Sequence, residues 1–256
     1  WTFRRNQYRL SMSANGKNWN AVIVPYLRKA NSTMCGICGI IGEDEGDVLQ
    51  RMLQRLVHRG PDEQGLYRQS GAMLGARRLR VIDPEGGHQP VHNENGTVWA
   101  VMNGEIYNYR ELRHDLLSKG HQLLTRSDTE VLVHLYEEEG FEAFRRLRGM
   151  FAVALWDQER RVAWLIRDRL GIKPLYYAIR PSEAGLGTRV VFSSEIPSLL
   201  EAVPDWRLRP ESIAEYLMQL YVPGPDTTIS GVHQLRPGQA MKISDGRVEL
   251  LRYYSP

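Results

Sequence analysis

Both cysteines of the chain lie in one short segment, MCGICGIIG, which begins at Met34. A cysteine thiolate is a strong nucleophile, but a free thiol with a pKa of ~8.5 is mostly protonated at neutral pH and needs a base. Cys35 directly follows a methionine, and cleavage after that methionine would expose the α-amine of Cys35. An α-amine has a reference pKa of about 7.7–8.0 and could take the proton of its own side chain. The junction therefore predicts a nucleophile that carries its own base.

On composition alone, either cysteine could be a small buried residue of a strand. Cys38 keeps that interpretation, because it cannot become N-terminal while Cys35 is intact and no thioredoxin-like helix follows the C-x-x-C pair. A structural zinc site would need two further ligands from the seven histidines, and the sequence has no H-x-x-x-H pair. The sequence predicts no metal site in this chain.

Other unusual polar motifs follow in expected turns: HRGPDEQG from His58, ARRLRVID from Ala76, VMNGEIYN from Val101 and TRSDTE from Thr125. A tetrahedral oxyanion needs donors that are already in place, such as a side-chain amide or backbone N–H groups in a turn. The Asn-Gly pair of VMNGEIYN offers both, although this dipeptide is also common in ordinary hairpin turns. The arginines of ARRLRVID could bind a carboxylate or form surface ion pairs, and the aspartate of TRSDTE could cap a helix.

In their order along the chain, these fragments resemble the glutaminase domain of class II glutamine amidotransferases, which are N-terminal-nucleophile (Ntn) hydrolases. Three more fragments are similar to the asparagine synthetase branch: RDRLGIKPLYY from Arg167, VFSSEIPSLL from Val191 and YVPGPDTTISGVHQLRPGQAMKI from Tyr221. The resemblance implies that a thiol attacks the side-chain amide of glutamine, forms a thioester and releases ammonia. It also implies ammonia transfer to a synthetase domain that uses aspartate, ATP and Mg²⁺, whereas this chain needs no cofactor.

The resemblance also assigns roles to single residues. The catalytic residues that it implies are Cys35, as nucleophile and through its α-amine as base, with Asn103 and Gly104 as the oxyanion hole. Arg78 would bind the α-carboxylate of glutamine, and the acidic residues would hold its α-ammonium. The HRGPD segment looks like the loop that closes over bound glutamine. The substrate-binding residues that it implies are Arg78, Leu79, Arg80, Val81, Ile82, Asn103, Gly104, Glu105 and Asp128.

The apolar periodicity predicts a strand over Gly36–Ile41, and then a helix, VLQRMLQRLVHR, which Asp47 caps and Gly60 stops. Asn108 is expected to cap a second helix, and Ser127 or Asp128 a third. Further strands are expected at residues 71–75, 98–102, 150–156, 162–166, 175–179 and 190–193. Helices between two groups of mainly antiparallel strands favour an α+β fold. The resemblance narrows this to a four-layer αββα sandwich of the Ntn-hydrolase type.

With 256 residues, of which 42% are hydrophobic and 25% charged, the chain can bury one full-sized core and the start of a second. Residues 1–34 have no helical or alternating period and are expected to be an extension or pro-segment outside the fold. Residues 35–195 would form the amidotransferase domain. Residues 196–256, punctuated by prolines, would form a connection and the start of a truncated synthetase domain, whose Ser-Gly-Gly-x-Asp-Ser loop is missing here.

The charge pattern argues against several partners. The net charge is +3 with no block of like charges, which gives no indication of nucleic-acid binding. No apolar run approaches the roughly 20 residues that a membrane span needs, so a membrane partner is not expected and the cytoplasm is the default location. The expected partners are glutamine and the ammonia-accepting synthetase domain, and a homodimer is compatible with the sequence.

Two other classes of protein stay open at this point. A papain-like thiol hydrolase would use Cys35 with a histidine base such as His58, and it would tolerate an extended N-terminus. A non-catalytic regulatory domain would fit if residues 1–34 stay attached and convert the amine into an amide. Within the amidotransferases, a synthetase-like member could transfer ammonia to an acceptor other than aspartate.

Overall fold

The computed structural model describes residues 34–42, 46–182 and 187–255, which form two six-stranded sheets. Sheet A consists, in spatial order, of β10 (Val232–Gln234), β8 (Tyr176–Pro181), β9 (Thr188–Ser193), β1 (Gly36–Gly42), β3 (Gly71–Arg78) and β2 (Glu63–Gln69). Sheet B consists of β12 (Arg247–Arg252), β11 (Gln239–Ser244), β7 (Val162–Arg167), β6 (Gly149–Asp157), β5 (Val98–Ile106) and β4 (Val91–His92). All neighbouring strands in both sheets run antiparallel.

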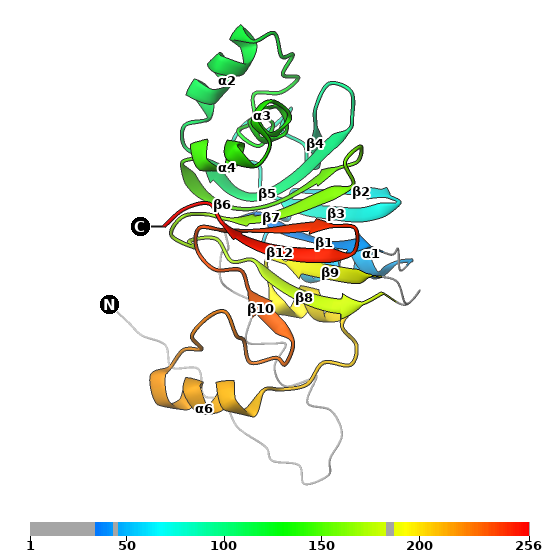
Figure 1. The fold of residues 1–256 in the computed structure, drawn as a ribbon, viewed down its shortest axis with the longest axis vertical. Coiled ribbons are helices and arrows are strands. Elements are labelled where there is room, and N and C mark those ends of the chain that lie inside the picture. The colour runs from blue at the N-terminus through cyan, green and yellow to red at the C-terminus, as the bar shows by residue number, and fades with distance from the viewer. Residues whose placement is uncertain (1–33, 43–45, 183–186, 256) are drawn as a thin grey trace, which may run out of the picture. The chain divides into compact units, whose positions relative to one another are not determined.

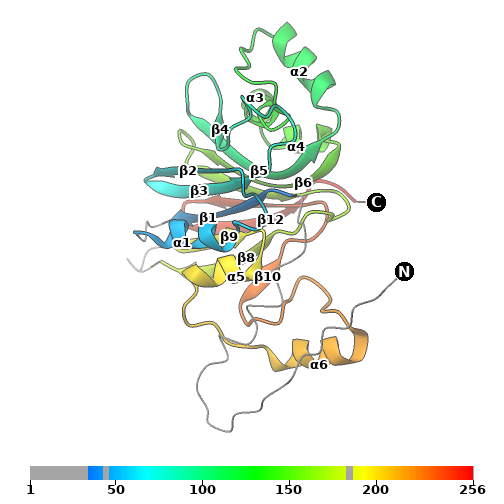
Figure 2. The ribbon, with the colours of Figure 1, turned by 180° about the vertical axis from the view of Figure 1, so that it is seen from behind.

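Three apolar clusters separate four layers. The first joins α1 (Val48–Arg55) and α5 (Ile196–Leu199) to the outer face of sheet A. The second lies between the two sheets. The third joins the outer face of sheet B to α2 (Tyr109–Ser118), α3 (Val131–Glu139) and α4 (Ala143–Arg146). Figures 1 and 2 show the two sheets between these helices from opposite sides, so the predicted four-layer αββα sandwich is confirmed.

The remaining elements are short or lie apart from the sheets. Two 3₁₀ helices extend neighbouring α-helices: η3 (Gly140–Glu142) precedes α4, and η4 (Leu200–Ala202) follows α5. Helix α6 (Pro210–Gln219) lies apart from both sheets in the two opposite views (Figures 1 and 2). No helix in the described part of the chain is both long enough and apolar enough to cross a membrane.

Strand β6 explains how the sheets pack on each other. Side chains alternate between the faces of a strand. Phe151, Val153 and Leu155 belong to the cluster under the helices, whereas Ala152 and Ala154 belong to the cluster between the sheets. Further alanines occupy the same inner layer on β3 and β7, at Ala72, Ala76 and Ala163. The inner face of β6 thus carries two alanines beside Trp156, whereas its other face carries larger aliphatic and aromatic side chains under the helices.

The expected helices form, but their ends differ from the prediction. Helix α1 buries Val48, Leu49, Met52 and Leu53 on one stripe, as predicted, yet it ends at Arg55 and not before Gly60. The cap positions before α1 and α2 are occupied by the predicted residues, Asp47 and Asn108, but neither side chain makes a capping hydrogen bond. The side chain of Asn108 instead bridges two backbone groups of residues 146 and 148.

The predicted cap of the third helix is wrong. Helix α3 begins at Val131, and its N-cap position is Glu130, so neither Ser127 nor Asp128 caps it. Oδ2 of Asp128 accepts a hydrogen bond of 2.9 Å from the backbone N–H of Ile106, at the end of β5. The carboxylate thus ties the segment before α3 to sheet B.

The predicted boundary at residue 195 also differs from the structure. Strand β10 pairs with β8 at the edge of sheet A, and β11 pairs with β7 in sheet B. Met241 and Ile243 of β11 are buried in the cluster between the two sheets. Residues 232–252 therefore belong to the same two sheets as the strands before residue 195, despite the prolines that suggested a connection.

A chain that ends at residue 195 is expected to lose its cooperative fold. It would lose eight large buried side chains, namely Leu199, Val203, Ile229, Val232, Leu235, Met241, Ile243 and Tyr253. Each is worth about 1.5–3 kcal/mol of burial, and the sum is comparable with the whole stability of a typical domain, about 5–15 kcal/mol. Urea unfolding followed by circular dichroism, with the chain ending at residue 255 as the control, measures this. A cooperative transition at the same urea concentration in both chains would contradict the extended domain.

Candidate active site

Cys35 lies immediately before β1, a central strand of sheet A. The register of β1 on β3 places Gly36 opposite Arg77, which brings Cys35 next to Leu79. The thiol Sγ is 3.4 Å from the backbone nitrogen of Leu79 and 3.7 Å from its carbonyl oxygen. On the other side, Nε of Arg59 donates a 2.9 Å hydrogen bond to the carbonyl oxygen of Cys35. Cys35 is thus fixed through both its side chain and its backbone.

A pocket opens beside Cys35 between the ends of strands from both sheets. Besides Cys35, eight of the site residues that were predicted from the sequence line this pocket. Arg80 is the one predicted site residue that does not. The side chain of Arg80 is 46% exposed and lies 3.6 Å from the carboxylate of Glu63. The lining residues are Met34, Cys35, Arg78, Leu79, Val81, Ile82, Gln89, Asn103, Gly104, Glu105, Ser127, Asp128, Thr129, Met150 and Lys173.

Asn103 and Gly104 lie within strand β5 and not in a hairpin turn. Gly104 has a φ of +144°, a backbone conformation that L side chains rarely adopt. A Cβ at this position would lie 2.0 Å from the carbonyl oxygen of Met150 on the paired strand β6. Only glycine fits here, so its place next to Asn103 is a requirement of the sheet.

The Asn103 side chain is fully buried and points at Ser194. In the structure Nδ2 of Asn103 is 3.5 Å from Oγ of Ser194, and Oδ1 has no hydrogen-bond partner among the described residues. Oγ of Ser194 already accepts a 3.0 Å hydrogen bond from the N–H of Ile37, so its own proton needs an acceptor. Rotating the side-chain amide of Asn103 by 180° exchanges its oxygen and nitrogen. Oδ1 then accepts the hydrogen bond from the hydroxyl of Ser194. Nδ2 then becomes the unpaired group beside the pocket.

Arg78 is both a pocket residue and the support of a loop. It is 5% exposed, and its Nη1 donates to Oε2 of Glu63 at 3.1 Å. Its Nη2 donates to the carbonyl oxygens of Ile82 and Asp83, at 2.9 and 2.6 Å. The guanidinium therefore holds residues 79–83 in a turn over the pocket, and its charge is partly balanced by the partly exposed carboxylate of Glu63.

The acidic residues lie at another part of the same pocket. Asp128 is 4% exposed. Burial raises the pKa of its carboxyl group, as does the negative charge of Glu105, while the hydrogen bond from Ile106 lowers it. One pocket thus combines a buried guanidinium with two carboxyl groups, which is the pattern needed to hold opposite charges of one ligand.

The environment of Cys35 does not by itself favour a thiolate. Burial raises the pKa of the thiol, while the hydrogen bond from Leu79 and the charges of Arg78 and Lys173 partly oppose the shift. In this chain the nitrogen of Cys35 forms an amide with Met34 and cannot act as a base. A proton acceptor has to come from elsewhere. Cys38, by contrast, is fully buried in β1, and burial raises the pKa of its thiol far above the usual range.

The HRGPD segment supports Cys35 from outside the pocket. Nη1 of Arg59 donates to Oε1 of Glu195 at 2.8 Å, and Nε2 of His58 lies 2.9 Å from the same oxygen. His58 does not line the pocket, and neither does any other histidine of the described residues. The base that a papain-like hydrolase needs next to its cysteine is therefore missing from this pocket.

Lys173 was not among the predicted site residues, although it lies in the motif RDRLGIKPLYY that supported the resemblance. Asp168 accepts hydrogen bonds from three backbone N–H groups of the loop, those of Leu170, Ile172 and Lys173. Arg167 donates to the carbonyl oxygens of Gly171 and Lys173 from the other direction. Arg167 and Asp168 thus hold the loop at residues 170–173 in a turn from two sides. This turn directs Lys173 into the pocket.

Lys173 is a buried ammonium, only 4% exposed. Its Nζ is 2.9 Å from Sδ of Met34. Burial and the nearby Arg59 lower its pKa, whereas the charges of Glu105 and Cys35 raise it. Met34 therefore occupies the side of the pocket where this cation lies.

The sequence matches the family described as "Glutamine amidotransferase domain" over residues 34–254. It is 38% identical over 229 residues to glutamine-hydrolyzing asparagine synthetase 1 of Bacillus subtilis (strain 168), covering 86% of this chain and 35% of the relative. It is 43% identical over 171 residues to glutamine-hydrolyzing asparagine synthetase 2 of Arabidopsis thaliana, covering 65% of this chain and 28% of the relative. The chain spans about a third of the length of these curated relatives.

Two solved structures share the fold. Glutamine phosphoribosylpyrophosphate amidotransferase from B. subtilis, complexed with ADP and GMP, superposes with a TM-score of 0.61 at 18% identity. A protein described as the allosteric regulatory enzyme of purine biosynthesis superposes with a TM-score of 0.63 at 20% identity. Each alignment covers 87% of this chain and 50% of the other.

Replacing Lys173 by methionine should raise the pKa of Cys35. The ammonium stabilises the thiolate, so its removal disfavours the charged form and shifts the alkylation profile to higher pH. The rate of iodoacetamide alkylation measured against pH gives this pKa, and the buried Cys38 should stay silent. Lys242→Met, on β11 and outside the pocket, is the matched control and should leave the profile unchanged. An unshifted profile in Lys173→Met would exclude an electrostatic effect of Lys173 on the thiol.

Proposed function

The chain belongs to the glutamine amidotransferase domain family, and from this membership we propose that Cys35 hydrolyses the side-chain amide of glutamine and releases ammonia. The observation that carries the proposal is the pocket itself. It combines a cysteine thiol, a buried amide side chain beside a glycine, a guanidinium and two carboxyl groups. A free amino acid with a side-chain amide needs each of these partners.

The charges indicate how glutamine is oriented. Arg78 suits the α-carboxylate, because its guanidinium places a permanent positive charge at the wall of the pocket. Asp128 and Glu105 suit the α-ammonium, and ion pairing with the ligand would offset the burial that raises the pKa of Asp128. The turn at Leu79, Val81 and Ile82 would line the space between these ends. Arg80, which the resemblance included, would act at most through the ion pair that it shares with Glu63.

The chemistry then follows from the groups at the other end of the pocket. The thiol gives its proton to a base, and sulfur attacks the amide carbon to form a tetrahedral oxyanion. Nδ2 of Asn103 and the N–H of Gly104 would stabilise that oxyanion. Collapse of the intermediate breaks the carbon–nitrogen bond, and the nitrogen leaves as ammonia with the proton. Water then hydrolyses the thioester, which gives glutamate and restores the thiol.

The base in this proposal is the α-amine of Cys35, which requires that residues up to Met34 be removed. Burial opposes thiolate formation, and no histidine of the described residues lines the pocket to serve as the base instead. Removal of Met34 would also take away the sulfur that contacts Lys173. The ammonium would then be free to act on the thiolate or on the substrate.

The ammonia acceptor is proposed from the relatives. The relatives are glutamine-hydrolyzing asparagine synthetases, of which this chain spans about a third. We propose that the ammonia is used to convert aspartate to asparagine by an ATP- and Mg²⁺-dependent synthetase domain outside this sequence. Transfer to another acceptor is the alternative. A homodimer and a cytoplasmic location stay predictions of the sequence.

A protein that begins at Cys35 should release ammonia from glutamine, whereas the chain that retains residues 1–34 should not until it is cleaved. The reason is that an amide nitrogen cannot accept the thiol proton. Ammonia release and intact mass, measured on the same sample, test this. An uncleaved chain with full activity would exclude the α-amine as base. Cys35→Ala should lose the glutaminase activity but keep its fold. Cys38→Ala is the matched control and should keep both the activity and the fold.

Asn103→Ala, made in the form that begins at Cys35, should lower kcat about 100- to 1,000-fold with a smaller change in KM. Loss of one oxyanion donor weakens the transition state more than the bound substrate. Steady-state glutaminase kinetics measure both constants, and thermal unfolding tests whether the fold is kept. Asn95→Ala, at an exposed turn, is the control. A kcat within about threefold of the parent enzyme would remove Asn103 from the oxyanion hole.

A further inference from the structure

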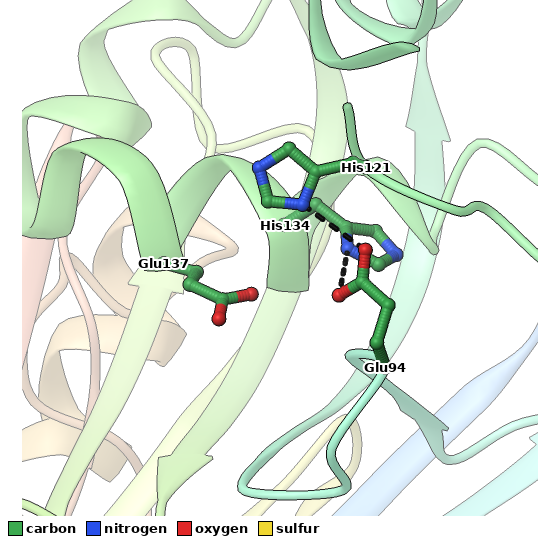
Figure 3. Close-up of side chains that lie close together, drawn as sticks. All are labelled: Glu94, His121, His134 and Glu137. Atoms are coloured by element: carbon green, nitrogen blue, oxygen red, sulfur yellow. Dashed lines mark hydrogen bonds and ion pairs between the residues drawn. The ribbon is translucent and has the colours of Figure 1, made fainter. Parts of the chain in front are cut away.

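Four side chains that could bind a metal ion converge on the helix side of sheet B. Glu94 comes from the turn between β4 and β5, His121 follows α2, and His134 and Glu137 lie on α3. Their ligand atoms all lie within 4.8 Å of one another, and Figure 3 shows them facing a common space. We propose that these four residues form a binding site for one divalent transition-metal ion of the zinc type. The sequence predicted no metal site, because the ligands come from three distant segments.

The spacing of the ligand atoms suits such an ion. Nδ1 of His121 is 3.1 Å from Oε1 of Glu94, and Nδ1 of His134 is 3.1 Å from Oε2 of the same carboxylate. In a tetrahedral zinc site with bonds of about 2.0–2.2 Å, neighbouring ligand atoms are about 3.3 Å apart. Glu137 lies three residues after His134 and thus on the same face of α3. A modest contraction of the cluster around an ion would complete the tetrahedron.

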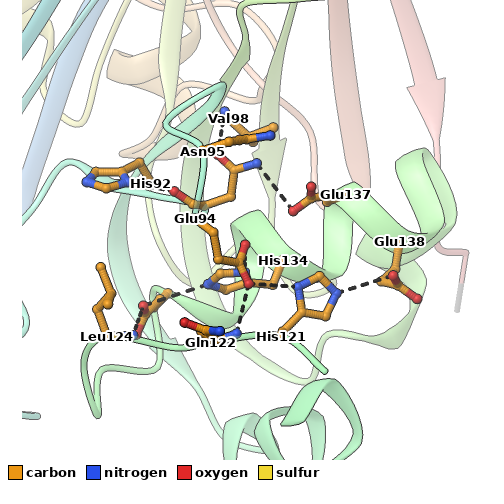
Figure 4. A network of polar contacts seen from close by, with 12 residues as sticks. His92, Glu94, Asn95, Val98, His121, Gln122, Leu124, His134, Glu137 and Glu138 are labelled. Carbon is orange, nitrogen blue, oxygen red and sulfur yellow. Dashed lines mark hydrogen bonds and ion pairs between the residues drawn. The ribbon is translucent and has the colours of Figure 1, made fainter. Parts of the chain in front are cut away.

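The outer nitrogens of both imidazoles face carboxylates. Nε2 of His121 is 3.2 Å from Oε1 of Glu138, and Nε2 of His134 is 3.7 Å from Oε1 of Glu130. Figure 4 shows His121 between Glu94 and Glu138 from close by. Metal-binding histidines usually direct their second nitrogen to a carboxylate or carbonyl, which fixes the tautomer and the orientation of the ring. His121 has that arrangement, with Nδ1 directed inward and Nε2 at hydrogen-bond distance from Glu138, whereas Nε2 of His134 only faces Glu130 from 3.7 Å.

The two inner carboxylates are held in place by neutral donors. The backbone N–H of Gln122 donates to Oε1 of Glu94 at 2.8 Å. Nδ2 of Asn93 donates to Oε2 of Glu137 at 3.2 Å. Within the described residues, neither Glu94 nor Glu137 pairs with a lysine or arginine, whereas Glu138 lies 3.5 Å from Lys119 and Glu130 lies 3.9 Å from Arg113. The carboxylates that face the common space are therefore the ones that lack a fixed cation.

His134 provides an independent indication of a ligand. It is 1% exposed, and neither of its ring nitrogens makes a hydrogen bond of normal geometry with any described residue. A buried polar group without a partner is unfavourable. A metal ion bonded to Nδ1 would satisfy that buried nitrogen and balance the charge of the facing carboxylates.

The ligand chemistry selects the class of ion. Two imidazole nitrogens and two carboxylate oxygens suit Zn²⁺ and neighbouring first-row ions, whereas Mg²⁺ and Ca²⁺ prefer oxygen ligands alone. The exposed side chains of Glu94 and Glu137 leave an entry path from solvent. A bound ion would link the β4–β5 turn to α3 and to the segment that begins at His121, and its effect would be structural.

Zinc titration of a tag-free protein tests the site. The Cys35→Ala variant avoids competition from the thiol, and isothermal titration calorimetry with a Zn²⁺ salt should give one ion per chain. The melting temperature should rise by several degrees, because an ion that binds only the folded state stabilises it. His121→Ala and Glu137→Gln should each weaken binding about tenfold or more. Circular dichroism checks that both variants keep the fold.

The matched control is His114→Ala, since His114 is an exposed histidine of α2 that does not belong to the cluster. It should bind zinc as the parent does. The proposal is overturned if the parent shows no saturable binding of one ion, or if His121→Ala and Glu137→Gln bind as tightly as His114→Ala. Zinc binding that persists in both cluster variants would identify another site. The cluster would then be an ion-pair network only.

Discussion

The apolar packing between the two sheets, to which β1 and β5 both contribute, determines where the reactive groups meet. Ile37 on β1 and Val101 on β5 belong to the same buried cluster. Residues two apart on an extended chain lie on the same side, so Cys35 and Asn103 should lie on the inner sides of their strands. A thiol from one sheet and an amide from the other are thus brought to one pocket by core packing.

Most charged residues of the recognised motifs act on the backbone. Arg59 holds the carbonyl of Cys35, and Arg78 holds the turn at residues 79–83. Asp168 gathers the N–H groups of the loop that presents Lys173. Ser194 joins β1 to Asn103. Because buried polar groups need partners, these side chains fix the loops in one conformation, which is what a preorganised oxyanion site requires.

The fold could be predicted from the sequence where local pattern and burial agree. Strand β1 and the stripe of α1 are apolar and regular, whereas the edge strand β2 reads EQGLYRQ and carries no such pattern. Residues 196–256 were assigned to a connection because prolines are local signals, while the pairing of β11 with β7 is a long-range one. The position of Lys173 was missed for the same reason: it depends on the turn built by Asp168.

One segment connects the pocket with the proposed ion site. Glu130 accepts hydrogen bonds from the backbone of Leu124 and Thr125, and it also faces His134 one turn further along α3. Asp128, which lines the pocket, lies between these anchors and is tied to β5 through Ile106. If residues 121–130 became more or less rigid, the position of the Asp128 carboxylate would therefore change with them. The position of the substrate's ammonium partner depends on how firmly α3 and its preceding segment are held to sheet B.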